Sequence, residues 1–304
     1  MLLNGHEGAV YSLAFDSSGQ CMASCSADRQ ILLWDVYGEC KNYNVLSGHK
    51  NAILEVKWDG DKLLSCSADK TVALWDANKG TRIRKYTDHK GIVNSCALAS
   101  HTSGLSCSGS DDSSVLVWDA RSRKYIQSIP HDYQVTSVCM SADGYTVFSG
   151  GIDNTLRQWD LRMDDPTQPV LSLTQQGMDT ITCLSLNAAG THVLCNSMDS
   201  GLRSWDVRPY FEGTGAEDER CERFYQGHRH GAEKVLLKCA WSPNGARVAA
   251  GSADRLVHIW DTDSTKELYC LPGHKGSVNE VLFHPTEPII ASCGSDKQIF
   301  LGEL

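Results

Sequence analysis

The sequence has no long hydrophobic run and no excess of positive charge. No apolar stretch approaches the roughly 18 residues that span a bilayer, and the start, Met1 to His6, has neither the basic segment nor the apolar core of a secretion signal. The net charge of −9 at pH 7 repels a phosphate backbone. We therefore expect no membrane partner and no direct sequence-specific contact with nucleic acid.

The sequence also lacks the short motifs of common catalytic and cofactor sites. It contains no glycine-rich phosphate loop and no His-Glu-x-x-His motif, so we expect no cofactor, no metal and no enzymatic activity. Cys21 and Cys25 resemble half of a metal site, but no second cysteine pair has a matching spacing. The 13 cysteines are odd in number and stand singly, which is typical of proteins in the reducing cytosol or nucleus.

What the sequence does contain is a repeat. Six Trp-Asp pairs have tryptophans separated by 41, 43, 41, 46 and 55 residues, and an aspartate stands six positions before each tryptophan. Periods near 40 residues are typical of four-stranded propeller blades. Alternating apolar stretches such as Val10 to Phe15 predict strands, and clusters of Gly, Asn, Asp and Pro predict turns between them. No window has a comparable helical period, so we expect almost no helix.

Four residue types recur at fixed places in these units. The histidines that open the units are His6, His49, His89, His131, His228 and His274. The serines four positions before the repeat aspartate are Ser24, Ser65, Ser108, Ser149 and Ser292. The aspartates are Asp28, Asp69, Asp112, Asp153, Asp199, Asp254 and Asp296, and the tryptophans are Trp34, Trp75, Trp118, Trp159, Trp205 and Trp260.

Some units depart from this pattern. The seventh unit ends in Gly302-Glu303 where the others have Trp-Asp. The fifth unit has Gly177 in place of its histidine, and Cys195 and Ala250 replace the serine in units five and six. We expect an all-β fold with a single domain over residues 1–304, a seven-bladed β-propeller of four-stranded antiparallel blades. The repeats cover approximately residues 5–41, 48–81, 88–124, 130–165, 176–208, 227–265 and 273–304.

This pattern resembles the WD-repeat (WD40) family over essentially the whole chain. In that family a sequence repeat supplies the outer strand of one blade and the three inner strands of the next. The resemblance therefore implies that Leu2 to Asn4 pairs with the last strand, around Ile299 to Leu301, and closes the ring.

The recurring Ser, His and Asp invite comparison with a hydrolase triad. A catalytic site needs one copy in one cleft, whereas this set recurs in most units, so its recurrence favours a structural role shared by the blades. The resemblance implies that the histidine, serine, aspartate and tryptophan of a unit form a buried hydrogen-bonded chain, which pairs groups that would otherwise be costly to bury.

Departures from the repeat indicate where partners could bind, because propeller function usually lies in variable loops. The loop after Asp206 has about a dozen extra residues and should project from the bottom face. It carries Arg208, Tyr210 and Phe211, which are residue types that anchor interfaces. Four extra residues between His228 and Trp241 should enlarge a top-face loop with Arg229 and His230. Basic residues that follow turn aspartates or blade histidines could make the top rim locally positive: Arg29, Lys70, Arg255, Lys275 and Lys297.

Several segments resemble one branch of the family more closely. Trp205 to Pro209, Ala249 to Arg255, Pro272 to Glu280 and the ending Phe300 to Leu304 are similar to the WD-repeat subunits of the U5 small nuclear ribonucleoprotein. That resemblance implies a nuclear, non-catalytic scaffold in pre-mRNA splicing. It would be a monomeric subunit that contacts the large central U5 splicing protein and other spliceosomal proteins. Members of this branch carry a polar N-terminal extension, which this chain lacks.

One alternative belongs to another class of function. Trp118 to Arg121, Trp159 to Arg162 and Trp205 to Arg208 resemble the Trp-Asp-x-Arg element by which some propellers dock onto a ligase adaptor. The protein could then be a substrate receptor of a cullin-type ubiquitin ligase.

Overall fold

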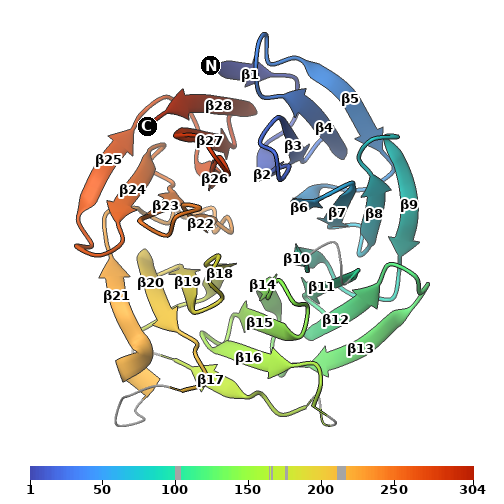
Figure 1. The fold of residues 1–304 in the computed structure, drawn as a ribbon, viewed down its shortest axis with the longest axis vertical. Helices are drawn as coiled ribbons and strands as arrows, with labels where there is room; N and C mark the ends of the chain where they lie inside the picture. The colour runs from blue at the N-terminus through green and yellow to red at the C-terminus, as the bar shows by residue number, and fades with distance from the viewer. Residues whose placement is uncertain (100–103, 164, 166, 175–176, 211–216) are drawn as a thin grey trace.

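The computed structural model describes residues 1–304 apart from 100–103, 164, 166, 175–176 and 211–216. In this described part, 28 strands form seven four-stranded antiparallel sheets that surround a central axis (Figure 1). The predicted seven-bladed propeller is therefore confirmed. One short 3-10 helix, η1 (Glu217–Arg220), lies between strands, and no helix of the described residues could cross a bilayer.

The blades are numbered in chain order, and the strands of each blade are given from the innermost to the outermost. Blade 1 consists of β2 (Val10–Phe15), β3 (Cys21–Ser26), β4 (Gln30–Asp35) and β5 (Asn42–Ser47). Blade 2 consists of β6 (Ile53–Asp59), β7 (Lys62–Ser67), β8 (Val72–Asp76) and β9 (Thr81–Tyr86). Blade 3 consists of β10 (Val93–Leu98), β11 (Leu105–Ser110), β12 (Ser114–Asp119) and β13 (Tyr125–Pro130). Blades 4 and 5 consist of β14 (Val135–Met140), β15 (Thr146–Gly151), β16 (Leu156–Asp160), β17 (Leu171–Leu173); and β18 (Ile181–Leu186), β19 (His192–Ser197), β20 (Gly201–Asp206), β21 (Cys221–Tyr225). Blades 6 and 7 consist of β22 (Cys239–Trp241), β23 (Arg247–Gly251), β24 (Val257–Asp261), β25 (Glu267–Leu271); and β26 (Val278–Phe283), β27 (Ile289–Gly294), β28 (Gln298–Glu303), β1 (Leu2–Asn4).

The two ends of the chain close the ring as the resemblance implied. Strand β1 pairs antiparallel with β28, with Leu2 opposite Phe300 and Asn4 opposite Gln298. Blade 7 thus takes its outermost strand from the start of the chain (Figure 1). This closure makes the three-residue β1, and not the longer β28, the outer edge of blade 7, and a short edge strand is a poor template for unwanted strand addition.

The hydrophobic core lies between neighbouring blades. One cluster joins Ile31 and Leu33 of blade 1 to Ile53 and Val56 of blade 2, together with Trp75. Because each sheet packs against a neighbour on both faces, the middle strands are buried almost continuously, whereas the outer strand β9 is mostly exposed.

The faces of the ring differ in the loops they carry. We call top the face with the turns between the second and third strands and the connections to the next blade, and bottom the opposite face. In each blade the residue after the turn aspartate has φ between 61° and 76°. This left-handed conformation favours Gly or Asn, yet blades 1, 2, 6 and 7 place Arg29, Lys70, Arg255 and Lys297 there.

Candidate partner-binding site

Blades 1, 2 and 3 contain the complete hydrogen-bonded chain. In blade 1, His6 Nδ1 lies 2.7 Å from Asp28 Oδ2 and its Nε2 lies 2.7 Å from Ser24 Oγ, which also accepts the Trp34 indole N–H at 2.8 Å. The same contacts occur in blade 2 among His49, Ser65, Asp69 and Trp75. They occur again in blade 3 among His89, Ser108, Asp112 and Trp118. Blade 7 keeps His274, Ser292 and Asp296, and the Phe300 ring lies 4.6 Å from that of His274.

These contacts occupy the polar atoms that a hydrolase would need free. The Ser65 hydroxyl is fully buried and is shared between His49 and Trp75. Burial alone would raise the pKa of Asp69, but hydrogen bonds from the Lys50 amide, Thr71 and His49 lower it to about 2. The geometry ties the top loop, the second strand and the third strand of a blade together.

Removing one member of this chain should destabilise the propeller. We expect Asp69→Asn to lower the free energy of unfolding by about 1–3 kcal/mol, because the His49 N–H and the Lys50 amide lose a charged acceptor. Urea denaturation followed by circular dichroism measures the change. Asp61→Asn, an exposed carboxylate in the same blade, is the matched control and should leave the midpoint unchanged. An equal midpoint for both variants would contradict a structural role for Asp69.

Blade 4 does not form the expected chain. Asp153 pairs with Arg157 instead of His131, and His131 Nδ1 lies 3.2 Å from the Ile129 carbonyl oxygen. His131, Ser149 and Trp159 still form the remaining contacts. The reason is the side chain four residues after the aspartate, which is Arg157 here and an uncharged Leu32, Ala73 or Leu116 in blades 1 to 3.

Blades 5 and 6 depart in the same way. Asp199 pairs with Arg203, and Asp254 lies 3.0 Å from His258 Nε2. The Trp205 indole N–H has no acceptor among the described residues, in keeping with the replacement of its serine by Cys195.

The histidine and tryptophan of blade 6 also find other partners. His228 Nε2 lies 2.8 Å from Asn196 Oδ1 of blade 5, and the Trp260 indole donates to the Gln226 carbonyl. The expectation that the repeat aspartate joins the hydrogen-bonded chain of its own unit was wrong for Asp153 and Asp254. Asp199, whose unit has neither the histidine nor the serine, pairs with Arg203 instead. A basic or histidine side chain four positions after the aspartate was the available signal.

A second polar network, which the repeat pattern did not reveal, surrounds the axis. At one register position of the innermost strands, the side chains of Ser12, Glu55, Ser95, Ser137 and Glu280 accept a backbone N–H from the next blade. Lys238 occupies the corresponding position of blade 6 and cannot accept a hydrogen bond. Its amine instead lies 2.9 Å from Glu55 Oε1 and 3.7 Å from Glu280 Oε1.

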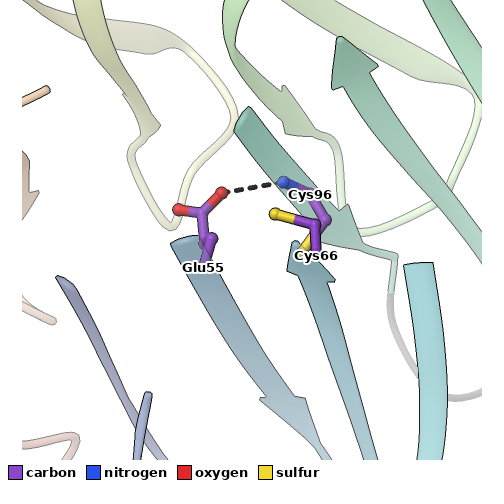
Figure 2. A group of neighbouring side chains, drawn as sticks. All are labelled: Glu55, Cys66 and Cys96. Atoms are coloured by element: carbon purple, nitrogen blue, oxygen red, sulfur yellow. Dashed lines mark hydrogen bonds between the residues drawn. The ribbon is translucent and has the colours of Figure 1, made fainter. Parts of the chain in front are cut away.

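Glu55 is the centre of this network. Figure 2 shows its carboxylate on β6 facing the backbone nitrogen of Cys96 on β10, beside the Cys66 thiol. A glutamate with two cysteines is a plausible set of metal ligands. However, the Glu55 carboxylate already contacts the Ser95 hydroxyl, the Cys96 amide and the amines of Lys57 and Lys238. Its two oxygens are therefore engaged by protein donors.

The top face has a basic half and an acidic half. The side chains of Arg29, Lys50, Lys70, Arg229, Arg255, Lys275 and Lys297 are exposed and belong to the contiguous blades 6, 7, 1 and 2 (Figure 1). The top turns of blades 4 and 5 contain Asp132 and Asp179 but no lysine or arginine. The acidic protein thus presents positive charge on one side of this face.

The second insertion does not simply enlarge a loop. Strand β22 begins only at Cys239, and Val235, Leu236 and Lys238 line a cavity of about 210 Å³ beside the innermost strands. His230 is half-buried, and burial lowers the pKa of its ring to about 4. His230 is therefore neutral at pH 7 and adds no charge to the basic half, whereas the neighbouring Arg229 side chain is exposed.

The first insertion connects β20 to β21 at the bottom. Arg208 is exposed, but its Nε lies 2.9 Å from Asp206 Oδ2, so its guanidinium is held against the blade. Tyr210 is 90% exposed, and Phe211 lies outside the described residues. A hollow of about 930 Å³ in the bottom face is lined by residues of blades 2 to 5 and by Pro209 of this loop.

Comparison with known proteins shows which family has these features. The chain matches the WD domain, G-beta repeat family in seven segments, residues 1–35, 40–76, 80–119, 123–160, 167–206, 219–261 and 265–301. It is 47% identical to the U5 small nuclear ribonucleoprotein 40 kDa protein of Dictyostelium discoideum, over 100% of this chain and 84% of that protein. The chain belongs to this U5 40 kDa family of WD-repeat proteins. Identity to the Homo sapiens member is 48%, over 100% of the chain and 83% of that protein.

Another relative is named as a splicing factor. The chain is 45% identical to the pre-mRNA-splicing factor cwf17 of Schizosaccharomyces pombe, over 99% of this chain and 86% of that protein. None of these relatives supports the ligase-receptor alternative. The arginines of two Trp-Asp-x-Arg elements, Arg162 and Arg208, pair with the aspartate of their own element.

Proposed function

We propose that this protein is a non-catalytic, monomeric scaffold subunit of the U5 small nuclear ribonucleoprotein that acts in pre-mRNA splicing in the nucleus. The observation that carries the proposal is the 47% identity, over the whole chain, to a protein named as a U5 subunit. The propeller supports it, because a rigid ring with varied loops can hold several proteins at once. Its partners would be the large central U5 protein and other spliceosomal proteins.

The basic half of the top face is the surface we propose for the main contact. Arg29, Lys70 and Lys297 project from equivalent turns of three adjacent blades, with φ of 72°, 68° and 69°. Arg229, Arg255 and Lys275 continue the same positive arc. Complementary charge steers association and fixes orientation, so this arc suits an acidic segment of a splicing protein. The bottom loop with Arg208, Tyr210 and Phe211 is a second candidate contact, supported by the exposure of the Tyr210 ring.

The test is affinity purification of the tagged full chain from nuclear extract at moderate salt, with identification of the bound proteins and RNAs. We expect U5 RNA and the large U5 proteins to be recovered with the wild type. The top variant, Arg29→Glu with Lys70→Glu and Lys297→Glu, should reduce this recovery at least tenfold, because it replaces attraction by repulsion. These turns keep the same backbone strain, since Glu, Arg and Lys all carry a Cβ.

The matched control makes the same change in net charge on the opposite face. Lys41→Glu with Lys79→Glu and Lys266→Glu alters three exposed bottom-face lysines and should leave recovery unchanged. Equal losses in both triple variants would overturn the assignment of the top face. Loss of recovery with Tyr210→Ala alone would place the main contact on the bottom loop. Absence of all splicing components from the wild-type sample, or recovery of a cullin and its adaptor, would overturn the proposed function.

A further inference from the structure

Three potential metal ligands meet on the outer flank of blade 6. His258 on β24 and Glu267 on β25 approach to 2.5 Å between Nδ1 and Oε1. The Cys270 sulfur on β25 lies 2.9 Å from Glu267 Oε1 and 3.5 Å from His258 Nδ1. Imidazole nitrogen, carboxylate oxygen and cysteine sulfur are the three donor types that zinc prefers.

A β-bulge brings these side chains to one face. Glu267 and Cys270 are three positions apart, so in a regular strand they would point to opposite faces. The register shifts between the pairs Ile259 with Tyr269 and Trp260 with Glu267, which leaves Leu268 as an extra residue. Since His258 and Trp260 share a face, their partners Cys270 and Glu267 share it too.

The orientation of the His258 ring is fixed from its other side. Its Nε2 lies 3.0 Å from Asp254 Oδ2, and the ring stacks on Trp260 at an interplanar angle of 17°. A carboxylate that accepts the second ring N–H of a histidine is the usual partner behind a metal-bound imidazole. On the opposite side of the ring, Nδ1 donates its N–H to the Glu267 carboxylate, so a metal bound at Nδ1 would take the place of this proton on the side of Glu267 and Cys270.

The charge at this cluster is uncompensated by lysine or arginine. Among the described residues, the ion pairs of Asp254 and Glu267 involve only His258. In the two other groups of potential metal ligands, a lysine or an arginine does contact a carboxylate. Lys57 and Lys238 contact Glu55 in the axial group, and Arg208 holds Asp206 in the group with His192 and Glu222.

We propose that His258 Nδ1, Glu267 and Cys270 bind a zinc ion, with Asp254 as the positioning residue behind His258. Zinc bonds of about 2.0–2.3 Å in a tetrahedral site place ligand atoms about 3.3–3.7 Å apart. The distance from Cys270 Sγ to His258 Nδ1 already has this value, and the partly exposed Glu267 side chain needs to withdraw by about 1 Å. On binding, the proton on His258 Nδ1 and the Cys270 S–H proton leave to solvent, and the ring nitrogen and the thiolate bind the metal in their place.

This site would fasten the outermost strand of blade 6 to the strand beneath it. Cys270 and Glu267 belong to an exposed strand, so the metal has access from solvent and a fourth position is left for water. Blade 6 lacks the serine of the repeat and diverts its aspartate to His258. The metal would supply a cross-link in a blade that lacks the regular hydrogen-bonded chain.

Zinc binding by the full chain tests the proposal. The purified protein is freed of metal with a chelator and then dialysed against zinc chloride, and bound zinc is counted by metal analysis. Cobalt(II) chloride, as a spectroscopic substitute, should give a thiolate-to-cobalt charge-transfer absorption. We expect one equivalent of zinc per chain, and a loss of affinity of about 10–100-fold for Asp254→Asn, which removes the group behind His258.

The control variant, Cys21→Ala, removes one cysteine, as the test variant Cys270→Ala does. Cys270→Ala should lower zinc affinity at least tenfold and abolish the cobalt band, whereas Cys21→Ala, another cysteine with an accessible side chain, should change neither. Both variants should keep the circular dichroism spectrum of the wild type. If Cys270→Ala binds zinc as the wild type does, or if the wild type binds none, the cluster is only a histidine held between two carboxylates and the proposal is overturned.

Discussion

Lys238→Met is expected to lower the free energy of unfolding by about 3–5 kcal/mol, because it leaves buried carboxylates without their cation. Glu55 and Glu280 are 3% and 2% exposed, and both face the Lys238 amine. Burial alone would raise the pKa of Glu55, but Lys238 and Lys57 lower it to about 2. Without Lys238, the Glu55 and Glu280 side chains would share the one partly exposed amine of Lys57. Urea denaturation at pH 7 measures the loss.

A second substitution distinguishes the charge effect from lost packing. In the double variant Lys238→Met with Glu280→Gln, the surviving charges are Glu55 and Lys57, and the glutamine oxygen can still accept the Leu13 N–H. We expect the double variant to be more stable than Lys238→Met alone. If the second substitution makes the protein less stable, the destabilisation comes from packing and not from an uncompensated carboxylate.

Acidification from pH 7 to pH 5 is expected to destabilise the propeller through its buried histidines. Burial lowers the pKa of the His228 ring to about 3 and that of His230 to about 4, and it also lowers the pKa values of His49, His131 and His274. The unfolded chain, with histidine pKa values near 6.5, binds more protons in this window, so stability falls as pH decreases. His228 alone should account for about 2 kcal/mol at pH 5.

The surroundings of the two His228 ring nitrogens favour the neutral imidazole. Its Nε2 donates to Asn196, while its Nδ1 is buried without a partner in the described structure, so a proton there would have no acceptor. Urea midpoints at pH 7, 6 and 5 should therefore decrease in order, and His228→Asn should reduce the pH dependence. A midpoint that is constant over this range would contradict the buried neutral state.

Below pH 4 a further loss of stability is expected as Asp69 and Glu55, each with a pKa of about 2, become protonated.

The hydrogen-bonded chain that the family resemblance implied forms where each blade keeps the four repeat residues. His6, Ser24, Asp28 and Trp34 meet because identical spacing in a meander of strands places identical residues at identical register positions. The aspartates Asp153, Asp199 and Asp254 do not take part in such a chain. Each carboxylate instead pairs with the side chain four positions later, which is Arg157, Arg203 or His258. A partner choice of this kind depends on distance in space, which residue types alone do not express.

The sequence by itself determined the number of blades and their meander of strands, because a 40-residue period and alternating apolar residues specify local strands and turns. The closure of the ring by the two chain ends was implied by the resemblance to the WD-repeat family. Only the tertiary structure decided which side chains meet across blades. Lys238 and Glu55 are 183 residues apart and approach each other because the ring brings blades 6 and 2 to a common axis. The same closure gathers single basic residues of four blades into one half of the top face. Each of these features depends on the ring, in which residues that no local pattern relates become neighbours.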